Sequence, residues 1–133
     1  MLDHVSAKVG DVPAAKAFYE QLFAPLGVQL MMDGAEEGWC GFGTGSGIPQ
    51  FWITNTEGRG AAHFAFTAPD RATVDAFYEA AIAAGGKDNG TPGERKYHDG
   101  YYGAFVLDPD GNNIEVVFHG PAKKSAESVK VSF

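Results

Sequence analysis

Cysteine and basic residues are both scarce in this chain. Cys40 is the only thiol among 133 residues, which excludes an intramolecular disulfide and a cysteine-rich zinc site. Its place in a strand-like run favours a small buried core residue. The 10 Lys and Arg are outnumbered by 17 Asp and Glu, and they cluster only at residues 94–96 and 123–124. A nucleic-acid binder needs a basic face, so we expect no nucleic-acid partner.

Long apolar runs are also missing. No stretch approaches the roughly eighteen apolar residues of a membrane span, and the N-terminus does not read as a charged-then-apolar leader. We therefore expect a cytoplasmic protein with no membrane partner. Hydrophobic residues nevertheless make up 44% of the chain and aromatic residues 13%. That content is sufficient for the core of one globular domain.

An internal repeat organises the sequence. His4 lies in a strand-like run at residues 2–9, and His63 lies at a matching point in the run at 61–67. Each run is followed by an amphipathic helical pattern that contains the triplet Phe-Tyr-Glu. The order strand, helix, three strands then occurs twice. We predict two modules of the βαβββ type, with this division of the chain: residues 1–54, a linker at 55–60, residues 61–119, and a C-terminal extension at 120–133.

Local signals set the expected element bounds. Asp11 is a candidate N-cap for a first helix over Ala14–Ala24, and a second helix is expected over Arg71–Ala84. The sequence Asp108-Pro109-Asp110-Gly111 is a strong turn signal between the last two strands. The expected strands after the helices are Val28–Met32, Trp39–Phe42, Ile48–Thr54, a weak one within Lys87–Lys96, Tyr102–Leu107 and Asn113–Phe118.

The repeat gives meaning to two histidines and one glutamate that are far apart in sequence. If the first strands of the two modules lie side by side about a pseudo-dyad, His4 and His63 converge, and Glu115 on the last strand can join them. A carboxylate that faces a sheet interior without a partner is costly, so a cation is the simplest explanation for Glu115. Two imidazoles and one carboxylate suit Fe, Zn, Ni or Mn. The competing interpretation is that both histidines are ordinary surface or core residues.

Two further groups are candidates for a substrate site. His98 and Tyr101 lie in a Tyr-His-Asp-Gly-Tyr-Tyr phrase that could form a loop over the metal, with His98 in acid–base chemistry and Tyr101 or Tyr102 shaping the pocket. The alternative is a turn whose aromatic rings pack on the sheet edge. Trp39 and Trp52 are candidates for a pocket wall, although strand aromatics are more often core residues.

Four phrases in the chain carry a resemblance to a known family: Leu2-Asp3-His4-Val5, Ala17-Phe18-Tyr19, Ala24-Pro25-Leu26-Gly27 and Asp108-Pro109-Asp110-Gly111-Asn112-Asn113-Ile114-Glu115. Together they resemble the vicinal oxygen chelate superfamily, which includes glyoxalase I, extradiol dioxygenases, fosfomycin-modifying enzymes and bleomycin-resistance proteins. The resemblance covers residues 1 to about 119. It implies an α+β fold in which two βαβββ modules form a cupped mixed sheet with the helices outside. It also implies a divalent metal held by His4, His63 and Glu115, a small-molecule substrate, and a homodimer.

One departure from the superfamily affects the functional prediction. Glyoxalase members usually add a fourth ligand from the last strand of the first module, but residues 48–54 contain no carboxylate or histidine, and Gln50 offers only an amide oxygen. The three candidate ligands that are present lead us to expect a glyoxalase- or dioxygenase-like enzyme that acts on a substrate with adjacent oxygens. Its reaction would be that of a lyase, an isomerase or a dioxygenase. The alternatives are a metal-free drug-binding protein of the bleomycin-resistance type and a scaffold that only dimerises.

Overall fold

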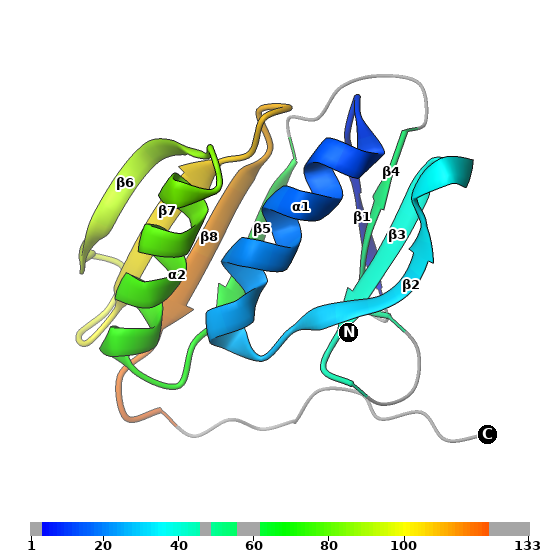
Figure 1. Cartoon of the computed structure of the whole chain (residues 1–133). Helices are drawn as coiled ribbons and strands as arrows, with labels where there is room; N and C mark the ends of the chain where they lie inside the picture. The colour runs from blue at the N-terminus through cyan, green and yellow to red at the C-terminus, as the bar shows by residue number, and fades with distance from the viewer. Residues whose placement is uncertain (1–3, 46–48, 56–61, 123–133) are drawn as a thin grey trace.

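A computed structural model describes residues 4–45, 49–55 and 62–122 of the chain (Figure 1). Most of the predicted linker and of the C-terminal extension lies outside these ranges, and the predicted domain bounds stay a prediction. The first module contains β1 (Val5–Lys8), α1 (Val12–Phe23), η1 (Ala24–Leu26), β2 (Gln29–Gly34), η2 (Ala35–Glu37), β3 (Trp39–Gly43) and β4 (Phe51–Thr54). The second contains β5 (His63–Thr67), α2 (Arg71–Ala83), β6 (Lys87–Glu94), β7 (Tyr102–Leu107) and β8 (Asn113–Phe118).

The predicted fold class is confirmed: the protein is α+β, and its described residues form two α-helices, two short 3-10 helices and two four-stranded mixed sheets. The strand orders are β1-β4-β3-β2 and β5-β8-β7-β6, so each module forms its own sheet with the same topology. The first strand of each module pairs in parallel with the last, and the other pairings are antiparallel. The two sheets lie side by side, with β1 and β5 at their inner edges and both helices covering one side (Figure 1).

Local capping explains where the helices begin. The Asp11 side chain accepts a hydrogen bond from the Ala14 N–H at 2.9 Å, as predicted, and α1 begins at Val12, two residues earlier than expected. Pro13 fits this first turn because the N–H that proline lacks would have no partner inside the helix. Asp70 caps α2 in the same way through the Thr73 N–H at 2.8 Å. In the described part of the chain no helix is long and apolar enough to cross a membrane.

The core lies between the sheets and the helices. Alternate residues of each strand point toward the helices, as the sequence pattern of β1 predicted: Ala7 is fully buried, whereas Ser6 and Lys8 are exposed. Aromatic rings join the modules, because Phe51 on β4 packs edge-on against Phe66 on β5 with centroids 5.5 Å apart. This shared core holds the two modules together.

A buried polar cluster also joins the modules. Asp108, which precedes the β7–β8 turn, is only 3% exposed and accepts the hydroxyl of Tyr19 from α1 at 2.7 Å. The Asn112 amide group donates to Asp108 at 2.7 Å and to the backbone carbonyl of Lys8 at 3.1 Å. Asp110 accepts the backbone N–H of Gly10 at 2.8 Å. The predicted Asp-Pro-Asp-Gly turn is therefore an inter-module clamp as well as a hairpin turn.

Candidate functional site

The candidate site lies on the second sheet, on the face turned away from the helices. Glu115 on β8 pairs across the sheet with Ala65 on β5 and Phe105 on β7. Paired residues share a face, so the Glu115 and Phe105 side chains project to the same side. His63 stands two residues before Ala65 and therefore shares that face, and its ring stacks on Phe105 with centroids 6.2 Å apart. Glu115 is 4% exposed, which makes it one of three buried polar residues in the described chain.

The buried carboxylate of Glu115 has two partners within the chain. Oε2 lies 3.0 Å from Nε2 of His63, and Oε1 accepts a hydrogen bond from the Tyr101 hydroxyl. Burial and this bond raise the pKa of Tyr101, so the hydroxyl stays protonated and donates. Glu115 therefore has a phenol and an imidazole as partners within the chain, and the charge it faces depends on what lies between it and the imidazole. Among the described residues no buried side-chain nitrogen or oxygen lacks a partner.

The hydrogen bonds of His63 constrain what lies between it and Glu115. Nδ1 lies 3.2 Å from the carbonyl oxygen of Asn113, which can only accept, so Nδ1 carries a proton. Nε2 then faces a carboxylate oxygen at 3.0 Å. Two lone pairs at that distance repel each other, so a proton or another cation must lie between His63 and Glu115. A backbone carbonyl that fixes the ring in this way is also the usual support of a metal-binding histidine.

His4 does not join this pair within one chain. The described residues contain no group of three or more His, Cys, Asp or Glu side chains that could hold a metal. Asn112 contacts the carbonyl of Lys8, at the end of β1, and neighbours Asn113, which pairs with His63. The end of β1 is therefore next to the start of β5. His4 precedes β1, about 13 Å further along the strand at about 3.3 Å per residue. Each histidine stands at the start of its strand, but β1 and β5 run in opposite directions (Figure 1), so the two histidines lie at opposite ends of the junction between the modules.

The repeat also identifies the position where a fourth ligand would stand. If His4 corresponds to His63, then Ser6 corresponds to Ala65. Ser6 pairs with Trp52, just as Ala65 pairs with Glu115. Trp52 therefore occupies, in the first module, the position that Glu115 occupies in the second.

The predicted pocket residues of the first module lie partly together. The rings of Trp39 and Trp52 are 5.9 Å apart and form an aromatic pair. Gln50 instead lines a small cavity of about 200 Å³ between the modules, together with Phe51, Phe66 and other side chains. It is one of the polar residues in a mostly apolar wall.

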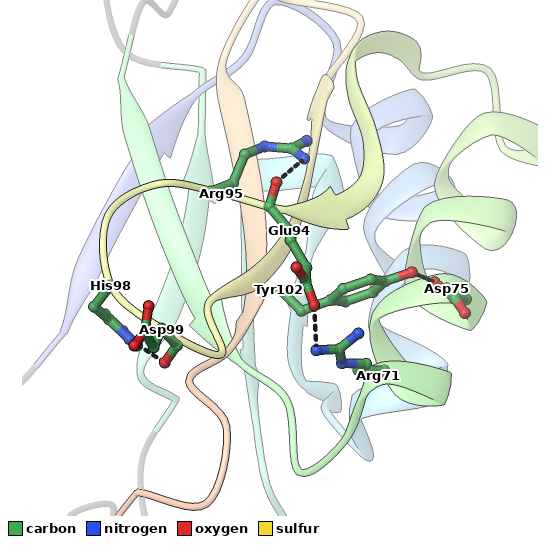
Figure 2. Close-up of polar contacts among 7 residues, drawn as sticks. All are labelled: Arg71, Asp75, Glu94, Arg95, His98, Asp99 and Tyr102. Carbon is green, nitrogen blue, oxygen red and sulfur yellow. Dashed lines mark hydrogen bonds and ion pairs between the residues drawn. The ribbon is translucent and has the colours of Figure 1, made fainter.

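The phrase at residues 97–102 divides between two faces. Tyr101 points to Glu115, and His98 lies beside it with ring centroids 5.2 Å apart. His98 is exposed, donates through Nδ1 to the Asp99 carbonyl at 3.0 Å, and places Nε2 2.9 Å from Nδ1 of His119. Tyr102 points the other way, toward α2, where its hydroxyl donates to Asp75 at 2.8 Å (Figure 2). Tyr102 therefore does not share a face with Glu115, contrary to its assignment to the pocket.

Sequence reasoning missed one residue of this face. Arg95 is half-buried, with its guanidinium 5.6 Å from the centroid of the Phe105 ring. The signal available in the sequence was its place in one of the two basic clusters, but composition alone does not say which basic side chain is held against the sheet.

The paired βαβββ modules, with an imidazole–carboxylate pair on the face opposite the helices, define a protein of the glyoxalase-like class. The chain belongs to the Glyoxalase/Bleomycin resistance protein/Dioxygenase superfamily, whose family model matches residues 1–116.

Solved structures support this membership. A glyoxalase/bleomycin resistance protein from Albidiferax ferrireducens is 30% identical, with 88% of this chain and 97% of that one covered and a TM-score of 0.74. A family enzyme from Burkholderia phytofirmans is 25% identical over 86% and 95% of the chains, with a TM-score of 0.65. Glyoxalase I from Zea mays is 26% identical over 87% of this chain and 43% of that one, with a TM-score of 0.63. No protein of curated function matches the chain.

Proposed function

We propose that this protein is a divalent-metal-dependent enzyme that acts on a small substrate with adjacent oxygens. The observation that carries the proposal is the His63–Glu115 pair. Both side chains present a donor atom to one point on the sheet, and the backbone carbonyl of Asn113 fixes the imidazole so that Nε2 faces Glu115. These two residues fit a metal ion as two ligands of a site. A metal bound there would supply Lewis-acid chemistry toward substrate oxygens.

We propose that a second copy of the chain supplies His4 as the third ligand. Within one chain His4 is remote from His63, yet a two-fold dimer would place equivalent surfaces of two copies against each other. Such a dimer would contain two identical sites, each built from His4 of one copy and the His63–Glu115 pair of the other.

The chain's own residues would perform the remaining work at the site. Tyr101 holds Oε1 of Glu115 and leaves Oε2 toward His63. Because its hydroxyl stays protonated, it would act as a hydrogen-bond donor and not as a base. His98 and His119 share one hydrogen bond at the rim, where an exposed imidazole can exchange protons with solvent. His98 would then be a proton carrier between the site and water.

One experiment separates the elements of this proposal. Metal content is measured in wild-type protein purified without chelator and in His4→Ala, His63→Ala and Glu115→Ala variants, with His119→Ala as a control histidine. Stoichiometric metal is expected in the wild type and in the control, and loss is expected in the other three.

A mixed dimer then tests whether two chains share the site. His4→Ala and Glu115→Ala chains carrying different tags are refolded together, and the heterodimer is isolated. If the ligands come from two chains, one of its two sites is intact and binds one metal ion, although neither parent dimer binds any. A heterodimer without metal would place all ligands in one chain.

The alternative function is a metal-free small-molecule binding protein. It is favoured by the finding that Glu115 is already satisfied by Tyr101 and His63, and by the aromatic pair of Trp39 and Trp52 on the first module. A wild-type protein that stays free of metal after incubation with each candidate ion would reject the enzyme proposal and support this alternative.

A further inference from the structure

Arg95 is held in a fixed position on the face that carries His63 and Glu115. Its Nη2 donates to the carbonyl of Thr91 at 2.7 Å, and its Nη1 donates to the carbonyl of Glu94 at 3.3 Å (Figure 2). A guanidinium has five N–H donors, so these two bonds leave three for a ligand. Backbone tethers reduce the conformational entropy that the side chain would lose on binding.

Two glycines make room for this guanidinium. A Cβ atom at Gly93 would lie 3.0 Å from Nη1 of Arg95, and one at Gly90 would lie 3.3 Å from Nη2 and 3.0 Å from the Phe105 ring. A side chain at either position would therefore press on the group. The two glycines, the carbonyl tethers and the aromatic ring together restrict the position of the guanidinium.

The charge of Arg95 is not neutralised by a neighbouring carboxylate. In the part of the chain that the structure describes, no Asp or Glu oxygen lies within ion-pairing distance of Arg95. Glu94, its immediate neighbour, instead pairs with Arg71 at 2.8 Å on the α2 side (Figure 2). A half-buried guanidinium with free donors and no anionic partner, in a chain of net charge −7, is the arrangement of an anion-binding residue.

Phe105 connects this guanidinium to the candidate metal ligands. Its ring contacts the Arg95 guanidinium, and the His63 imidazole stacks on it 6.2 Å away at an interplanar angle of 21°. A planar molecule lying on Phe105 could reach both groups at once. The backbone N–H of Arg95 donates to the backbone carbonyl of Tyr101 at 3.0 Å, which ties Arg95 to the residue that contacts Glu115.

We infer that Arg95 is a specificity residue that binds the carboxylate of a compact, planar substrate lying on Phe105. The inference rests on the proposed function for the other end of the substrate, whose adjacent oxygens would face His63 and Glu115. The substrate class is thus a small carboxylate with vicinal oxygens. The guanidinium contacts substrate by bidentate hydrogen bonds, for which lysine is a poor replacement.

Three probes test the inference by titration: protocatechuate, which has a carboxylate and adjacent hydroxyls; catechol, which has only the hydroxyls; and benzoate, which has only the carboxylate. Wild-type protein should bind protocatechuate at least about tenfold more tightly than catechol, the gain typical of charged hydrogen bonds. Arg95→Gln should abolish that preference, and Arg95→Lys should restore only part of it. The control is Lys96→Gln, which removes the same charge from an exposed neighbour and should keep the preference.

The benzoate arm separates this inference from the proposed metal site. Benzoate binding is followed by chemical shift changes in chelator-treated protein, with circular dichroism to confirm that each variant is folded. Benzoate binding that Arg95→Gln abolishes supports the inference even if the protein never takes up metal. An unchanged preference in Arg95→Gln, an equal loss in Lys96→Gln, or a wild type that does not distinguish protocatechuate from catechol overturns it.

Discussion

The hydroxyl of Tyr19 gives a stability prediction that can be tested with a matched control. The control is Tyr78, the equivalent tyrosine of the second repeat. Tyr19 is fully buried on α1 and donates to Asp108 at 2.7 Å, whose exposure is 3%. Burial, followed by the charge of Asp108, raises the pKa of Tyr19 well above its usual value. Tyr78 occupies the same place in the second Phe-Tyr-Glu triplet, but it is only partly buried and its hydroxyl partner is Asp88.

Tyr19→Phe keeps the ring and removes only the hydroxyl. A hydrogen bond to a charged group contributes about 1.5–3 kcal/mol. Asp108 would keep three other donors, the backbone N–H groups of Asp110 and Asn112 and the Asn112 amide, so it would not become an orphaned buried charge. We therefore expect the free energy of unfolding to fall by about 2 kcal/mol, within the range for one such bond.

Urea denaturation of wild type, Tyr19→Phe and Tyr78→Phe measures this difference, with the m-value checked for constancy. The Tyr78→Phe midpoint should not shift measurably. A loss below about 0.5 kcal/mol for Tyr19→Phe, the size of an ordinary surface substitution, would refute the role of the clamp. An equal shift in both variants would refute it as well, because the effect would then reflect the phenol and not its partner.

Two further predictions concern the inter-module clamp and the stability of the protein at low pH. Asn112→Ala removes the contacts to Lys8 and Asp108 and should cost about 2–3 kcal/mol in urea unfolding, whereas Asn113→Ala, on a half-buried side chain, should cost clearly less. The hydrogen bond from Lys16 lowers the pKa of Asp33 below its usual 3.8. A lowered folded-state pKa stabilises the protein above pH 3.8, and this stability is lost as the pH falls through the lowered value. Asp33→Asn should thus be less stable than wild type near neutral pH, and thermal unfolding across the pH range should show the two converging in acid.

Much of the architecture could be predicted because its signals are local. The Asp11 cap, the two helical patterns and the turn after Asp108 each depend on a few neighbouring residues. The weak strand signal within residues 87–96 is the described β6. Its irregular register, shifted near Gly90 and Gly93, explains why it lacks a clean alternation.

The site could be predicted only in part, because its contacts depend on geometry between modules. The repeat singled out His63 and Glu115, and the structure brings these two side chains together, since both lie on strands of one module. It could not show that Tyr101 satisfies Glu115, nor that Tyr102 turns to α2, because adjacent strand residues face opposite sides and the register was unknown. For the same reason the sequence could not show that Arg95 lies on the same face as Glu115.

The pseudo-dyad is consistent with a site whose ligands come from two chains. The charges at such a site would favour an anionic substrate. His4 and His63 each stand at the start of a strand, and β1 and β5 run in opposite directions, so the internal symmetry does not bring the two histidines together. The two-fold axis of the proposed homodimer would bring them together. At the position equivalent to Glu115 the first module has Trp52, so each proposed site would have two neutral imidazoles and a single carboxylate. A divalent ion in that proposed set would keep one net positive charge, and Arg95, which contacts the same Phe105 ring as His63, would add another. Two uncompensated charges next to a planar aromatic surface favour an anionic, planar substrate over a neutral one. The absence of a carboxylate at Trp52 and the fixed position of Arg95 thus point to the same substrate class.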